Sequence, residues 1–357
     1  MYTNMNINRR ASRRITVLLL AVLMLIAAGC GKEEPKQPAE STAQDGDVTL
    51  VIGAYSVVKD AFSELLPQFQ AYWKEQTGQK VVFQESYEAS GTQARAIAGG
   101  FEADVAILAM EGDLDKITDA GFITQDWKAQ PNHGLITKSI AVLGTREGNP
   151  KGIKDWDDLT RKDVKVLYPN PKTSGGAQWD INAIYGAGLK KSEAETGTKD
   201  PAFAKKYLAS IHKNVESLDK SGRASMAAFE YGVGDVIVTY ENELLARIMN
   251  GVKYDIVVPK NTILIENPAA VVDKNVDKHG TRKVAEAFIS YLQSEEAQRT
   301  FVKYGFRSVD EKVAEESKDK YVVPEGLFDI SYLGGWKEVR ASLYSKKGIW
   351  YQVLAGI

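Results

Sequence analysis

The 357-residue sequence predicts an α/β protein of two lobes, each a mainly parallel sheet flanked by helices, with a cleft between them. Three observations predict this class. Short β-rich runs alternate with helical patterns, the length exceeds what one hydrophobic core usually supports, and no Pro- or Ser-rich linker separates the halves. The missing linker indicates that the chain crosses between the lobes on extended strands.

The first thirty residues are typical of an export signal with a lipid anchor. Arginines precede the apolar run Ile15–Ala28, which is too short to span a bilayer comfortably and fits the core of a signal peptide over residues 1–29. Ala27-Ala28-Gly29-Cys30 resembles the lipobox of bacterial lipoproteins, whose cysteine is acylated, although Leu is usual where Ala27 stands. We expect an exported protein anchored at the outer face of the cytoplasmic membrane. The alternative is a plain cleaved signal with an incidental Cys30.

The rest of the chain divides at two candidate crossing strands. Residues 30–47 follow the signal as a flexible tether without large apolar side chains, and the folded part starts near Val48. The candidate crossings are Lys138–Ala141 and Glu266–Val271. They predict lobe 1 from residues 48–138 plus 267–310, lobe 2 from residues 139–266, and a C-terminal helical segment, residues 311–357, that packs across the lobes.

Six β-rich runs are predicted strands: Val48–Ala54, Val81–Gln84, Asp104–Leu108, Ser139–Gly144, Lys165–Tyr168 and Asp235–Tyr240. An apolar stripe from Phe62 to Trp73 predicts the first helix, and Gly78 ends it. Pro67 lies inside this stripe, so we expect a kink or a late helix start there. A second stripe, from Val284 to Leu292, predicts a helix near the other end.

Composition excludes several classes of function. The 45 basic and 47 acidic residues give a formal charge of −2, so no basic excess indicates a nucleic-acid partner. Cys30 is the single cysteine, which excludes an intrachain disulfide and a cysteine-cluster metal site. The three histidines are too widely spaced for a local metal or catalytic motif: His133, His212 and His279. We expect neither a metal nor a cofactor.

Three Ser-Gly turns carry the strongest functional signal, because each follows a predicted β-rich segment and precedes a helix: Ser90-Gly91, Ser174-Gly175-Gly176 and Ser221-Gly222. Glycine lets the backbone approach a ligand, and the first NH groups of a helix have no internal partner. Together with the helix dipole they can bind an anion without a cationic side chain. The alternative for each turn alone is an ordinary helix cap.

Two segments resemble the signature segments of the bacterial sulfate- and thiosulfate-binding proteins: Asn170-Pro-Lys-Thr-Ser-Gly-Gly-Ala-Gln-Trp179 and Gly232-Val-Gly-Asp-Val-Ile-Val-Thr-Tyr-Glu-Asn-Glu243. The resemblance covers roughly residues 48–345. It implies the two-lobed type II fold of periplasmic binding proteins and a receptor that closes over a dehydrated oxyanion for an ATP-driven importer. The implied partners are sulfate or thiosulfate and an ABC permease with its ATPase. A monomer is expected.

The resemblance also implies a set of ligand contacts made by neutral donors. They are the backbone NH of Ser56, the hydroxyls of Ser90 and Ser174, the NH groups of Gly175, Gly176 and Gly222, and the phenol of Tyr240. Tyr240 stands where the sulfate branch has tryptophan, which leaves open the choice between sulfate and thiosulfate. Ser56 stands where relatives commonly have Asp, although a backbone NH depends little on its side chain.

Charged residues near these positions have two interpretations. Asp235 and Glu241 are expected to cap or brace loops, and Lys172 and Lys220 to face solvent. Arg223 either touches the anion or braces its loop by pairing with a carboxylate outside the pocket. No carried-over contact is a carboxylate, so we expect the pocket to reject hydrogen phosphate, whose proton would lack an acceptor.

Two other functions remain open. One is a receptor for molybdate or another tetrahedral oxyanion, which differs in pocket volume. The other is a cleft enzyme that acts on an acidic substrate. Against an enzyme, the sequence has no nucleophile elbow, no Walker-type phosphate loop and no histidine near the Ser-Gly turns.

Overall fold

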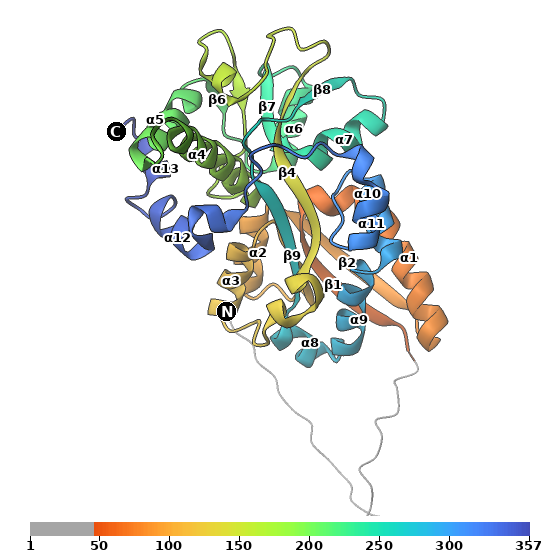
Figure 1. Ribbon diagram of the computed structural model, residues 1–357. Coiled ribbons are helices and arrows are strands. Elements are labelled where there is room, and N and C mark those ends of the chain that lie inside the picture. The colour runs from red at the N-terminus through yellow and green to blue at the C-terminus, as the bar shows by residue number, and fades with distance from the viewer. Residues whose placement is uncertain (1–45) are drawn as a thin grey trace, which may run out of the picture. The chain divides into compact units, whose positions relative to one another are not determined.

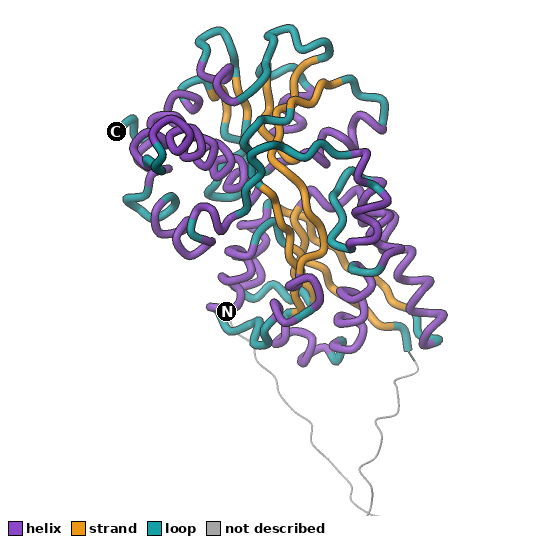
Figure 2. The backbone as a smooth tube through the Cα atoms, viewed as in Figure 1, coloured by secondary structure: helices purple, strands orange, loops and turns teal. Residues whose placement is uncertain are grey.

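The computed structural model describes residues 46–357, in which nine strands form one mixed sheet flanked by helices (Figures 1 and 2). The strand order is β2-β1-β3-β9-β4-β7-β5-β6, and β8 pairs with β4 beside this path. The strands are β1 (Val48–Tyr55), β2 (Val81–Glu88), β3 (Val105–Ile107), β4 (Leu135–Arg146), β5 (Val166–Leu167), β6 (Val215–Ser217), β7 (Val236–Tyr240), β8 (Tyr254–Val257) and β9 (Leu264–Val271).

Thirteen α-helices lie within the described residues: α1 (Lys59–Thr77), α2 (Ser90–Ala98), α3 (Glu111–Asp119), α4 (Gly175–Thr196), α5 (Pro201–His212), α6 (Gly222–Glu230), α7 (Glu241–Met249), α8 (Asp273–His279), α9 (Arg282–Leu292), α10 (Glu295–Lys303), α11 (Glu311–Glu316), α12 (Gly335–Ser342) and α13 (Ile349–Leu354). Short 3-10 turns occur between them, of which η1 (Ser56–Val58) directly follows β1. Strands alternating with helices confirm the predicted α/β class.

Two antiparallel strands join the parallel parts of the sheet. β1 pairs in parallel with β2 and β3, and β5 pairs in parallel with β6 and β7. The first half of β4 pairs with β9, and its second half pairs with β7 and β8. Figure 1 shows β4 and β9 running side by side through the middle of the sheet. The two candidate crossing segments lie within these strands.

The first helix follows its apolar stripe but does not start late. α1 begins at Lys59 and continues through Pro67, which lies on its exposed face. On that face water can bond to the carbonyl that proline leaves without an NH partner. The buried side packs Phe69 against Phe288 of α9, with ring centroids 5.0 Å apart. Gly78 ends the helix with φ of 75°, as predicted.

The expected C-terminal helical segment, residues 311–357, contains three α-helices, α11 to α13. Trp336 in α12 packs edge-to-face on Trp179 in α4, with ring centroids 4.8 Å apart. Arg340, also in α12, pairs with Asp115 in α3 at 3.0 Å. α12 therefore contacts helices that follow β3 and β5, which belong to different parallel parts of the sheet.

The signal peptide, the anchor at Cys30 and nearly all of the tether lie outside the described residues. Between residues 46 and 357, no helix combines the length and apolar character needed to cross a membrane.

Candidate anion-binding site

Several strand-to-helix junctions surround one small cavity of about 20 Å³. A space of this size holds one small ion or one or two water molecules. Its lining residues come from the ends of β1, β3, β5 and β7 and the first turns of four helices, α2, α4, α6 and α7, with Asp180 from the second turn of α4: Tyr55, Ser56, Val57, Ala89, Ser90, Ala109, Pro169, Ser174, Gly176, Asp180, Ser221, Gly222, Thr239, Tyr240 and Glu243. Six of the seven predicted contact residues are among them. The seventh, Gly175, lies beside the cavity.

Two of the Ser-Gly turns are also helix caps. The Ser174 hydroxyl accepts a hydrogen bond from the Ala177 NH at 3.2 Å, and the Ser221 hydroxyl accepts one from the Ala224 NH at 3.1 Å. Capping uses an acceptor lone pair of each serine and leaves its proton able to donate. The first NH groups of α4 and α6 have no partner inside the helix. The positive ends of both helix dipoles lie at these same N-termini, next to the cavity.

Ser90 differs from the expectation of a free hydroxyl donor. Its oxygen accepts a hydrogen bond from the Ala109 NH at 2.9 Å, and its proton is donated to Asp113 Oδ2 at 2.5 Å. Asp113 also pairs with Lys116 at 2.5 Å. The Ser90 hydroxyl is therefore engaged on both sides in this structure, and the start of α2 offers the cavity its backbone NH groups.

Tyr240 ends β7 and presents its phenol in the cavity. The residue is only 2% exposed, and its hydroxyl has no hydrogen-bond partner among the described residues. Burial raises the pKa of Tyr240 well above its usual value, so the phenol keeps its proton. The ring also lies close to Gly176, where an added Cβ would be 3.5 Å from Tyr240 Cε1. A buried, protonated and unpaired phenol is a suitable hydrogen-bond donor.

The two walls of the cavity approach each other most closely at Gly175. An added Cβ there would lie 2.9 Å from the Ala109 Cβ, 3.0 Å from Asp113 Oδ2 and 3.1 Å from the Ser90 Cβ. These distances leave no room for a side chain. Gly222 is less restricted, since its added Cβ would meet only Val57 Cγ2, at 3.7 Å.

Charged residues at the rim brace the junctions. Arg223 pairs with Asp60 at 3.0 Å and donates to the Ser56 carbonyl, which confirms the bracing interpretation. Lys172 and Lys220 are exposed, as predicted.

The acidic residues near Tyr240 also brace the structure, as expected. Glu241 forms a bidentate ion pair with Arg307, at 2.7 and 3.0 Å. Asp235 accepts a hydrogen bond from the Lys165 NH at 2.9 Å. Neither residue lines the cavity.

Besides the carried-over contacts, none of which is a carboxylate, the cavity has two carboxyl groups on its wall. Asp180 and Glu243 both line the cavity and are 1% and 2% exposed. Glu243 has a nearby cation, since Arg247 Nη1 lies 3.3 Å from its carboxylate. No contact implied by the family resemblance falls on Asp180, but helix geometry could have found it, because it follows Gly176 by four residues on the same face of α4.

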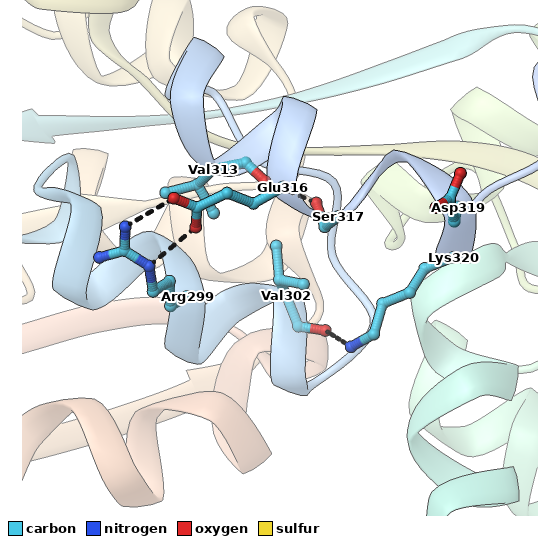
Figure 3. Close-up of a pocket in the computed structure, with 7 residues that line it drawn as sticks. All are labelled: Arg299, Val302, Val313, Glu316, Ser317, Asp319 and Lys320. Atoms are coloured by element: carbon cyan, nitrogen blue, oxygen red, sulfur yellow. Dashed lines mark hydrogen bonds and ion pairs between the residues drawn. The ribbon is translucent and has the colours of Figure 1, made fainter.

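A second cavity lies between α10 and the segment from α11 to Lys320 (Figure 3). Three of its four charged side chains form bonds to neighbouring groups. Arg299 forms two bonds to Glu316, and Lys320 reaches the Val302 carbonyl at 3.5 Å. No group of three or more metal-ligating side chains occurs in residues 46–357.

Residues 50–307 match the family model of the bacterial extracellular solute-binding proteins. The chain belongs to this family. It is 41% identical over 354 residues to a sulfate-binding protein of Synechococcus elongatus, covering 98% of both chains. It is 36% identical to a thiosulfate-binding protein of Escherichia coli, covering 86% of this chain and 91% of the relative. These relatives confirm the resemblance to the sulfate- and thiosulfate-binding proteins.

A solved structure confirms the fold. The sulfate-binding protein SubI of Mycobacterium tuberculosis H37Rv superposes with a TM-score of 0.76 at 33% identity, covering 84% of this chain and all of that one. A member of this family is an extracellular solute-binding protein and not an enzyme, so the cleft-enzyme alternative is set aside.

Proposed function

We propose that this protein captures sulfate, or thiosulfate, outside the cytoplasm and delivers it to an ABC permease. The observation that supports this proposal is the cavity itself. Three helix N-termini, the Ser174 hydroxyl and the Tyr240 phenol meet there, and no Lys, Arg or His is among the lining residues. These donors are neutral, which suits an anion that carries no proton and offers only acceptors.

The proposed contacts are the NH groups of Ser56, Gly175, Gly176 and Gly222, the hydroxyls of Ser90 and Ser174, and the Tyr240 phenol, with Ser90 requiring a change of its present hydrogen bonds. Hydrogen bonds to a charged group contribute about 1.5–3 kcal/mol each, so the set offers roughly 10–20 kcal/mol before desolvation. We expect a net binding free energy of about −8 kcal/mol, which is a micromolar dissociation constant.

Competition titration with four ions tests the proposal. The mature protein is titrated with sulfate, thiosulfate, molybdate and phosphate at one ionic strength. We expect sulfate or thiosulfate to bind with micromolar affinity. A tighter molybdate complex would favour the alternative oxyanion receptor. The proposal would be contradicted if sulfate and thiosulfate both gave no binding heat, or bound only with millimolar affinity.

We propose the lobes as residues 48–138 plus 267–310 and residues 139–266, with residues 311–357 packing across them. The ion pair Arg223–Asp60 and the hydrogen bond from Arg95 to the Lys172 carbonyl, 3.2 Å, both join the first lobe to the second. The close approach at Gly175 does the same. These contacts are what a cleft closed over its ligand requires, and closure is the signal that a permease can recognise.

We also propose that Cys30 is acylated and anchors the protein to the membrane. The small residues before it and the apolar run that precedes them support this assignment. Replacing Cys30 by Ala is expected to move the protein from the membrane fraction to the soluble exported fraction. An unchanged membrane fraction would contradict the anchor and leave the binding function untouched.

A further inference from the structure

Asp180 is the one carboxyl group on the cavity wall without a nearby cation. It lies in the second turn of α4 and is 1% exposed. Its Oδ1 atom is fully enclosed and has no hydrogen-bond partner among the described residues. Gly176, one helical turn earlier, and Ser174 line the same cavity. An unpaired carboxyl group is therefore aimed at the space where the anion is proposed to bind.

The titratable groups that face Asp180 are phenols from three elements: Tyr168 after β5, Tyr240 at the end of β7 and Tyr344 after α12. The Tyr168 hydroxyl bonds to His212 Nδ1 at 2.6 Å. The Tyr344 hydroxyl donates to the Gln178 carbonyl at 3.0 Å, so it is engaged elsewhere.

The other charged groups near the cavity do not offset the negative charge of an ionised Asp180. Glu243, from α7, and Asp113, from α3, are acidic, and the cations that pair with them, Arg247 and Lys116, are not among the lining residues. With burial and no cation, the charged form of Asp180 is disfavoured, and the pKa of its carboxyl rises well above the usual value.

Two negative groups in contact inside a dry cavity repel strongly, whereas a carboxylic acid can donate a hydrogen bond to an anion. We propose that Asp180 faces the bound oxyanion as a carboxylic acid and donates a hydrogen bond to it, so that each sulfate ion binds together with one proton. This inference rests on the proposed function. The proton comes from solvent and joins the Asp180 carboxylate, and no other bond changes.

The sign of the pH dependence follows from the higher pKa of Asp180 in the complex. Sulfate affinity is constant at pH values below the pKa of Asp180 in the open, hydrated cleft. Above that pKa the affinity falls by up to tenfold per pH unit, because each binding event then takes up one proton.

Hydrogen phosphate carries its own proton, and its OH group can donate a hydrogen bond to the ionised Asp180. It therefore binds without proton uptake. With Asp180 present, the site discriminates less strongly against phosphate than a site made only of neutral donors would. The same carboxyl group thus serves two kinds of tetrahedral dianion in different protonation states.

The test is titration calorimetry of the mature protein with sodium sulfate between about pH 5 and 10, in pairs of buffers with different ionisation heats. For sulfate above the pKa of free Asp180 we expect uptake of close to one proton. Phosphate, measured at about pH 8.5 where it is mainly the monohydrogen dianion, should give close to none.

Asp180→Asn keeps the shape and supplies an NH₂ donor without a titratable proton. We expect sulfate binding that no longer varies with pH, no proton uptake, and phosphate affinity at least tenfold below that of the wild type. The matched control is Asp119→Asn, at the exposed end of α3, which should leave every profile unchanged.

Sulfate binding by the wild type without proton uptake at any pH would overturn the inference while leaving the proposed function intact. Proton uptake that persists in Asp180→Asn would overturn it as well, because another group would then carry the proton. Failure of the wild type to bind sulfate at every pH would instead reject the proposed function.

Discussion

Replacing Gly175 by Ala is expected to weaken sulfate binding by roughly tenfold to hundredfold. The new Cβ would lie 2.9–3.1 Å from atoms of Ala109, Asp113 and Ser90, which are on the opposite wall of the cavity. Overpacking of this kind costs about 1–3 kcal/mol, and the cost falls on the closed state because only there do the walls meet. Calorimetry gives the affinity, and thermal unfolding without ligand should change little.

Gly222→Ala is the matched control for this prediction. It makes the same change at another helix N-terminus of the cavity, but its Cβ would have ordinary contact with Val57 at 3.7 Å. We expect affinity within about threefold of the wild type, a difference of less than 1 kcal/mol. Equal losses in both variants would show that closure at Gly175 is not what limits binding.

Replacing Trp179 by Ala is expected to lower the free energy of unfolding by about 3–5 kcal/mol. Trp179 is fully buried, its indole NH donates to the Ala109 carbonyl at 2.7 Å, and its ring packs on Trp336. The substitution removes a large side chain and both of these links. Urea unfolding followed by circular dichroism measures the effect.

Tyr231→Ala provides the control, since this aromatic residue is 91% exposed and its loss should change stability by less than about 0.5 kcal/mol. Trp179→Phe separates the two contributions of the indole, because it retains most of the packing and removes only the NH donor. A Trp179→Ala protein as stable as the Tyr231→Ala control would refute the assignment of Trp179 as a link between α4, α12 and the loop after β3.

The main strands could be predicted from the sequence because buried strands of a parallel sheet are continuous apolar runs. Val48–Ala54 and Asp235–Tyr240 match β1 and β7 to within one residue at each end. Short β6 and β8 were missed, since their side chains are mostly half-exposed and give no such run. β4 is longer than predicted because its first residues, from Leu135, pair with β9, a partner that local patterning does not reveal.

The site was predictable where it depends on local turn chemistry. Ser174 and Ser221 each cap a helix at the cavity, because a Ser-Gly turn after a strand places a helix N-terminus at the edge of the sheet. The bond that occupies Ser90 could not be predicted, because Asp113 comes from another helix. Asp180 was not predicted because it lies beyond the Ser-Gly turn, in the second turn of α4, although its spacing from Gly176 indicates the same helix face.

The pairing of β3 with β9 determines when the sheet can finish folding during synthesis. Val105 lies opposite Val271, so one neighbour of β3 is supplied by chain made long after β1, β2 and β3 have left the ribosome. Contacts between such distant parts of a sequence form slowly, because a long loop must close first. A newly made N-terminal portion therefore has a sheet edge without its partner strand. The polypeptide stays incompletely folded, in a form that can pass through a narrow export channel, until most of it has been synthesised.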